Sequence, residues 1–149
     1  MALSHSIAAA LILLCLGFPA CDDQGENIVS NPFPGPEPST YTYRAYTSAG
    51  VLAVSGSITL ARTDSTTVAG SWVLNGISST DRVGPQIGAG TLAGRIEGSK
   101  LSINLNPGWA DNNVILAGSV EGEKITGTWS WVTFAGPASS GTFEAVRKQ

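Results

Sequence analysis

The sequence predicts an all-β domain, a single small antiparallel up-and-down β-barrel of about eight strands, after a signal peptide and a Pro-rich tether. Three observations lead to this prediction. From Tyr41 onwards, apolar residues alternate with Ser, Thr, Arg and Glu at a period of two, which is typical of strands with one buried face. The stretches 92–103 and 116–127 read almost as copies of one hairpin. Glycines recur where core side chains are expected.

The first 20 residues have the pattern of an export signal. An apolar run from Ile7 to Leu16 precedes small residues and is too short to span a membrane. The segment "LGFPAC" resembles a bacterial lipobox, with Phe18 where Leu is usual and Cys21 directly after the cut. This resemblance implies that Cys21 becomes the lipidated N-terminus. The alternative is an ordinary signal with a chance cysteine.

The cysteine count favours lipidation. Cys15 lies inside the signal, so the mature chain would keep only Cys21 and could form no internal disulfide. Each buried methylene of an acyl chain adds about 0.8 kcal/mol, and more than one chain gives a stable anchor. We therefore expect a lipid-anchored protein of the bacterial cell envelope, at the inner or outer membrane, with its domain in the periplasm or at the cell surface.

A tether is expected over residues 21–39. Prolines stand at every second position from Pro32 to Pro38, and each fixes its own φ and favours extended backbone in its predecessor. Such a segment is a semi-rigid spacer of about 3 Å per residue. The barrel domain is then expected over residues 40–149.

Eight strands are expected in this domain, and no stretch carries a helical stripe of useful length. Their ranges are 40–47, 51–62, 66–74, 90–97, 100–105, 114–121, 124–133 and 140–147. In the duplicated hairpins, Gly98 and Gly122 stand at the first central position of a two-residue turn, where type II′ requires glycine. This register gives charged pairs next to the turns and apolar pairs one step inward. The pairs are Glu97 with Lys100, Glu121 with Lys124, Ile96 with Leu101, and Val120 with Ile125.

The pattern apolar-x-Gly-x-apolar occurs five times, at Gly56, Gly70, Gly94, Gly118 and Gly127. A glycine inside a strand costs about 0.5–1 kcal/mol relative to alanine, so five of them need a reason. The strongly bent strands of a small closed barrel supply one. The register places Gly118 opposite Gly127 and is expected to place Gly56 opposite Trp72, with large rings filling the space.

The chain from Tyr41 to Val146 resembles the lipocalin and avidin class of small meander barrels. The stretch "ITGTWSW" is similar to the Gly-x-Trp strand motif of those families. Their motif usually lies in the first strand, whereas Gly127 and Trp129 lie in the seventh expected here, so no ligand residue carries over. An outer-membrane barrel is the competing interpretation, but its strands usually run about 9–11 residues with lipid-facing apolar side chains. The shorter central strands favour an apolar interior and a soluble domain.

The expected loops are uneven. Short turns lie at one end, and the segments 48–50, 75–89, 106–113 and 135–140 lie at the other, as in barrels that bind at the mouth. Trp109 lies in one of these long loops, where it can contact a ligand or partner. The more common outcome for such a residue is that it plugs the barrel end. The further candidate contact residues are Asp111, Arg82 and Trp131.

Catalysis finds little support. His5 is the only histidine and would be removed with the signal, while Cys21 is committed to lipid. Ser–His and Cys–His chemistry and the usual zinc sites are thereby excluded. The segment 111–113, "DNN", could hold a hard cation, although a polar turn is the commoner use. The net charge of −3 without a basic stripe gives no indication of nucleic-acid binding. We expect no enzyme activity, cofactor or metal.

Two function classes remain. The first is a non-enzymatic, membrane-anchored envelope lipoprotein whose barrel binds a small apolar ligand or a protein partner at its long-loop end. The second is a structural or interaction module with a fully packed barrel and no ligand. The volume of the lumen distinguishes them, because the inward glycines make room that Trp72, Trp129 and Trp131 consume.

Overall fold

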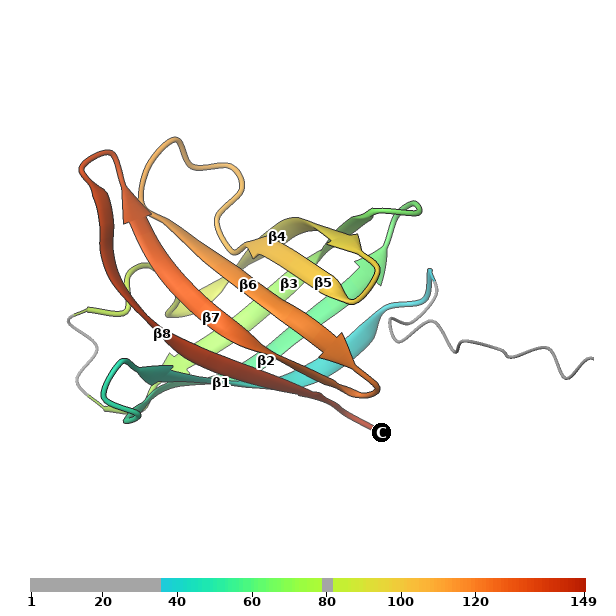
Figure 1. Cartoon of the computed structure of the whole chain (residues 1–149), viewed down its shortest axis with the longest axis horizontal. Helices are drawn as coiled ribbons and strands as arrows, with labels where there is room; N and C mark the ends of the chain where they lie inside the picture. The colour runs from blue at the N-terminus through green and yellow to red at the C-terminus, as the bar shows by residue number, and fades with distance from the viewer. Residues whose placement is uncertain (1–35, 79–81) are drawn as a thin grey trace, which may run out of the picture.

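Each strand pairs with the next one along the chain, and the last pairs back with the first, so the sheet closes on itself (Figure 1). The computed structural model describes residues 36–78 and 82–149 and shows one closed antiparallel up-and-down barrel. Its strands are β1 (Ser39–Thr47), β2 (Leu52–Arg62), β3 (Thr67–Gly76), β4 (Gly88–Glu97), β5 (Lys100–Asn104), β6 (Asn113–Glu121), β7 (Lys124–Thr133) and β8 (Gly136–Arg147). The fold class predicted from the sequence is confirmed. The expected signal peptide, Cys21 and the tether up to residue 35 lie outside the described residues.

The two similar hairpins, β4–β5 and β6–β7, have the expected register. Glu97 pairs with Lys100 and Glu121 with Lys124, and the apolar pairs follow one step inward. Gly98 and Gly122 have φ of 60° and 59°, the values that a type II′ turn needs at its first central residue. Local turn chemistry and core pattern therefore select the same pairing.

The central strands β3 and β4 are longer than expected, since they have 10 residues each. Two further expected details are wrong. The segment 135–140 was expected to be a loop, but β8 already begins at Gly136, where a φ of 105° makes a tight turn after Phe134 and Ala135. The long-loop end consequently carries one tight hairpin beside its longer loops.

The second correction concerns the β2–β3 register. Gly56 pairs with Leu74, whereas Trp72 pairs with Ile58. The cause lies in the turn, where the carboxylate of Asp64 accepts the backbone N–H of Thr66 at 2.8 Å and of Thr67 at 2.7 Å. These bonds hold the pKa of Asp64 below its usual value and centre the turn one residue later than expected.

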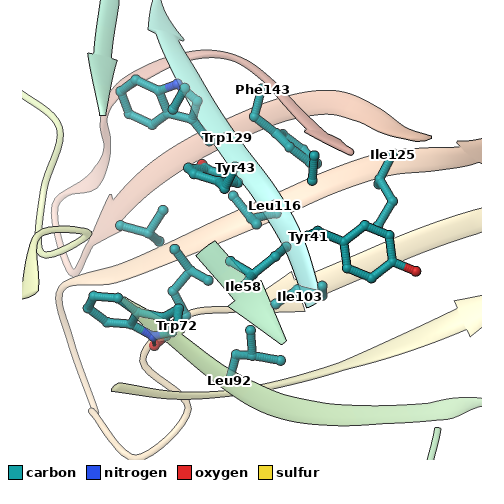
Figure 2. Close-up of a cluster of buried hydrophobic side chains, with 14 of the residues drawn as sticks. Tyr41, Tyr43, Ile58, Trp72, Leu92, Ile103, Leu116, Ile125, Trp129 and Phe143 are labelled. Atoms are coloured by element: carbon teal, nitrogen blue, oxygen red, sulfur yellow. Dashed lines mark hydrogen bonds between the residues drawn. The ribbon is translucent and has the colours of Figure 1, made fainter. Parts of the chain in front are cut away.

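The interior of the barrel is packed with side chains (Figure 2). The rings of Tyr43 and Phe143 stack with their centroids 5.7 Å apart, and Trp129 is 1% exposed. The side chains labelled in the figure come from all eight strands and meet along the axis: Tyr41, Tyr43, Ile58, Trp72, Leu92, Ile103, Leu116, Ile125, Trp129 and Phe143. An eight-stranded barrel has an interior just wide enough for side chains to fill, and here they fill it.

The glycines on the inward face let large rings and neighbouring strands come close. Trp72 lies directly over Gly90 of β4, and Trp129 lies over Gly141 of β8. Gly118 faces Gly127 as expected. A Cβ at Gly118 would meet the backbone carbonyl oxygen of Thr126 and stand 3.1 Å from Cζ of Phe143. The close backbone contact explains why the sequence tolerates glycine in mid-strand.

The two ends of the barrel differ. The turns β2–β3, β4–β5 and β6–β7 lie at one end, the short-turn end, together with the first described residues and the C-terminal strand end (Figure 1). Lys148 donates its backbone N–H to Thr40, and Arg147 donates to Glu123, which fixes the chain ends there. The segments β1–β2, β3–β4, β5–β6 and β7–β8 lie at the opposite, long-loop end.

We expect Gly118→Val to lower the free energy of unfolding by more than about 2 kcal/mol, because overpacking a core typically costs 1–3 kcal/mol and the added carbons meet backbone. Ala117→Val is the matched control, since Ala117 is exposed on the outer face one residue away. It should be nearly neutral in the same urea denaturation measurement. Equal losses for the two variants would contradict the assignment of faces.

Candidate functional site

The mouth at the long-loop end is closed by the chain itself. Residues 82–87 lie across the opening, where Val83 and Gln86 are fully buried. Tyr43 donates its hydroxyl hydrogen to Oε1 of Gln86 at 3.2 Å, and Nε2 of Gln86 donates to the carbonyl of Val83 at 2.7 Å. Burial raises the pKa of Tyr43 well above its usual value, so its hydroxyl remains a donor. Residues 82–87 of the β3–β4 segment therefore act as the plug of the barrel.

Two further contacts hold this plug in place. The indole of Trp131 packs against Gly84, whose φ is 65°. The side-chain amide of Asn106 donates to the carbonyl of Pro85 at 3.3 Å. Side chains from β7 and from the β5–β6 loop thus fasten the β3–β4 segment.

A cleft of about 310 Å³ lies beside the plug, between the beginning of β4 and the β5–β6 loop. We call it the mouth cleft. Ile87 and Thr91 line it on the β4 side, Pro107 and Trp109 on the loop side, and Trp72 lies at its base. It is a surface feature outside the packed lumen.

The cleft exists because β5 is short. The strand ends at Asn104, whose Oδ1 accepts the backbone N–H of Asn106 at 2.8 Å and draws the chain into a turn. Pro107 follows and has no N–H with which to continue a ladder. The indole of Trp72 donates instead to the carbonyl of Leu105 at 2.7 Å, so a side chain stabilises the point where β5 leaves β4.

Trp109 does not plug the barrel. Its side chain is 56% exposed, and the fully buried residues of the β3–β4 segment close the mouth instead. The backbone N–H of Trp109 donates to the carbonyl of Asn106 at 3.0 Å, while its side chain forms one wall of the mouth cleft. An exposed indole on a hydrogen-bonded loop is a suitable contact residue.

The other three candidate residues have different positions. Asp111 accepts the backbone N–H of Phe134 at 2.8 Å and joins the β5–β6 loop to the β7–β8 hairpin. Trp131 is half-buried and donates from Nε1 to Oδ1 of Asn112 at 3.1 Å. Arg82 is exposed and borders a smaller cleft of about 120 Å³ that also includes Trp129. Asp111 and Trp131 thus tie loops together, and Arg82 lies apart from the Trp109 cleft.

The segment 111–113 has the bonding of a polar turn. Oδ1 of Asp111 and Oδ1 of Asn112 accept hydrogen bonds from Phe134 and Trp131. Oδ1 of Asn113 accepts from Asn104 at 2.8 Å. The three oxygens have separate protein donors, which is the pattern of a loop anchor. Among the described residues, no group of three or more His, Cys, Asp or Glu side chains converges.

Exposed apolar side chains gather at the long-loop end. Phe134, at the tip of the β7–β8 hairpin, is 83% exposed. All four connections at this end carry at least one such residue, and we call the set the apolar rim: Val51, Ile77, Ile87, Trp109 and Phe134. Clusters of exposed apolar residues in proteins mark interaction sites.

Charge is distributed in the opposite way. Arg82 and Asp111 are the only charged residues in the described connections at the long-loop end. The other described charged residues lie on the strands or at the short-turn end, where Lys124 and Glu144 pair at 3.0 Å. The hydrogen bond from Lys124 holds the pKa of Glu144 below its usual value. Among the described residues, the long-loop end is therefore the apolar end of the barrel and carries few charges.

Comparison with protein-family models and with curated proteins finds no match to this chain. Within residues 36–78 and 82–149, no helix is long and apolar enough to cross a membrane.

Sequence reasoning missed several residues of this region. Gln86 reads as an exposed loop residue, and only its bond to Tyr43 on β1 shows that it belongs to the core. Phe134 was also missed, although Gly136 and Pro137 follow it closely and are the signal of a turn, where a side chain is usually exposed. The mouth cleft could have been sought from Pro107, because a proline so soon after the short strand β5 cannot continue a ladder along the longer strand β4.

We expect Trp109→Ala to leave the melting temperature within a few degrees of the wild type, because the side chain is mostly in water. Trp129→Ala is the comparison, since loss of a buried tryptophan typically costs about 3–5 kcal/mol. Differential scanning calorimetry measures both. A large loss of stability for Trp109→Ala would show that this ring supports the barrel.

Proposed function

We propose that this chain is a non-enzymatic, membrane-anchored envelope lipoprotein that binds a protein partner through its long-loop end. The gathering of exposed apolar side chains at the end that carries only two of the described charged residues supports this proposal. Exposing such an apolar surface to water is unfavourable, and large exposed apolar patches mark interaction sites. Aromatic residues are enriched in protein–protein interfaces. The barrel then serves as a rigid support that presents this end.

The packed interior bears on the kind of binding. Trp129, Phe143 and the buried Gln86 occupy the space that an internal ligand would need. A small apolar ligand would have to lie in the mouth cleft instead. The packed lumen also supports the second candidate, a structural module without ligand, but that candidate gives no role to the apolar rim.

The position of the chain ends supports an anchored arrangement. Residues 36–38 enter the barrel at the short-turn end, so the predicted tether and the lipid on Cys21 would attach there. The apolar rim lies at the opposite end and would face away from the attachment point. With about 3 Å per residue, an extended tether would reach on the order of 50 Å, enough for the rim to meet a partner clear of the bilayer.

Cys21→Ser should abolish acylation and release the protein from the membrane fraction, because the thioether and the new N-terminus both require the cysteine. Mass spectrometry of the wild-type membrane fraction should show a lipid-modified N-terminal peptide. Cys15→Ser is the matched control and should change neither result, since Cys15 would be removed with the signal. Unchanged membrane recovery of the Cys21→Ser protein would refute the anchor.

Photo-cross-linking in the cells that produce the protein tests whether the long-loop end binds a partner. We expect p-benzoylphenylalanine in place of Trp109 or Phe134 to form a discrete protein adduct after irradiation. The same residue in place of Ser99 or Glu123, both exposed at the short-turn end, should form none. Adducts absent at the rim, or equal at both ends, would contradict the proposed function and favour the structural module.

A further inference from the structure

One strand of the closed barrel has a free edge. β4 pairs with β3 from Gly88 to Arg95, but with β5 only from Ala93 to Glu97. Among the described residues, no strand therefore pairs with Gly88–Leu92 on the β5 side. The mouth cleft lies along this free segment.

The register shows which backbone groups face the cleft. Glu97 and Lys100 flank a two-residue turn, so they exchange hydrogen bonds across the β4–β5 pair. The direction of the backbone groups alternates along an antiparallel strand. The N–H of Ile96 accordingly points to the other side and donates to Thr66 at 2.7 Å. By the same alternation, Thr91 and Ala89 direct their N–H and C=O groups into the cleft.

The free edge is accessible to another chain. A Cβ built at Gly88 would have no heavy atom within 4 Å, and Ala89 and Thr91 are exposed. The carbonyl of Thr91 has one long contact, with Nε1 of Trp72 at 3.3 Å. Pro107 and Trp109 form the opposite wall. Space, backbone donors and acceptors, and an apolar wall thus occur together.

We propose that the Gly88–Leu92 edge binds an extended peptide segment of the partner by β-strand addition. This inference rests on the proposed function, because it names the subsite with which the long-loop end would hold a protein. The edge is about 16 Å long at about 3.3 Å per residue, enough for a peptide of four or five residues. The peptide carries N–H groups at alternate positions, so proline is excluded there, and it places an apolar side chain against Trp109 and Ile87.

The chemistry of the edge distinguishes this occupant from two others. An acyl chain would fill the apolar wall but would leave the N–H groups of Ala89 and Thr91 and the C=O group of Ala89 without partners, which is costly when they are buried. A second copy of the barrel would have to approach from the side on which the β5–β6 loop stands. A single extended strand needs only the cleft between that loop and β4.

The experiment uses the full chain in lipid nanodiscs and a display library of linear peptides of about seven residues. Peptides are selected on the wild type and counter-selected on Thr91→Pro, which removes the N–H that faces the cleft and leaves the β3 side of β4 intact. Thr91→Val is the matched control, because it changes the side chain and keeps the N–H. We expect selected peptides to bind the wild type and Thr91→Val alike, and Thr91→Pro about tenfold more weakly, the loss of about one hydrogen bond.

Synthetic variants of the best peptide, each with one N-methylated amide, test the backbone directly on the wild-type protein. The dissociation constant should rise about tenfold at alternate positions and change less than about twofold at the positions between them. Hydrogen exchange at Ala89 and Thr91 should slow when peptide is bound. This scan decides the matter even where Thr91→Pro does not fold.

Strand addition would be overturned if the N-methylated peptides lost affinity without alternation along the peptide. It would also be overturned if Thr91→Pro bound the selected peptides as tightly as the wild type. Displacement of the peptide by oleic acid, again without periodicity, would assign the cleft to an acyl chain and overturn it as well. Cellular adducts at Trp109 and Phe134 that persist in Thr91→Pro would leave the proposed function standing while this subsite fails. Absence of all rim adducts would instead contradict the proposed function itself.

Discussion

The closure of eight strands around a narrow interior is the constraint on which the rest of the structure depends. The interior of so small a barrel is just wide enough for side chains to fill. Trp72 and Trp129 fit because Gly90 and Gly141 face them on the neighbouring strands. Because the interior is filled, any binding surface must lie on the outside of the barrel. The loops at the ends can vary in sequence without disturbing the closed sheet.

The barrel could be predicted because its determinants are local. Gly98 and Gly122 each define a turn type, and the turn sets the pairing of the residues on either side. The β2–β3 register could not be predicted in the same way, because the side chain of Asp64 enlarges the turn through its bonds to Thr66 and Thr67. A turn that backbone geometry alone determines can be predicted from sequence, whereas one that a side chain shapes needs the structure.

The candidate site was predicted only in part. Trp109 was placed at the long-loop end from its position in a loop, and the structure puts its ring on a cleft wall. The free edge of β4 exists because β5 ends before it has paired along the whole of β4. This difference in length between two strands cannot be predicted from the sequence of either strand alone. The plug depends on a bond between Tyr43 and Gln86, residues 43 positions apart, and long-range contacts of this kind have no local pattern.

The hydrogen bond between Tyr43 and Gln86 ties one part of the long-loop end to the core. The parts of this end therefore differ in how well they tolerate substitution. The β3–β4 segment carries core residues, so substitutions at Val83 or Gln86 would affect the whole barrel. Residues 107–110 and 134–135 lie outside the core and can be replaced at little cost in stability. Selection in nature or in the laboratory could therefore change the surface of the long-loop end through substitutions in two short segments, while the fold that presents them stays the same.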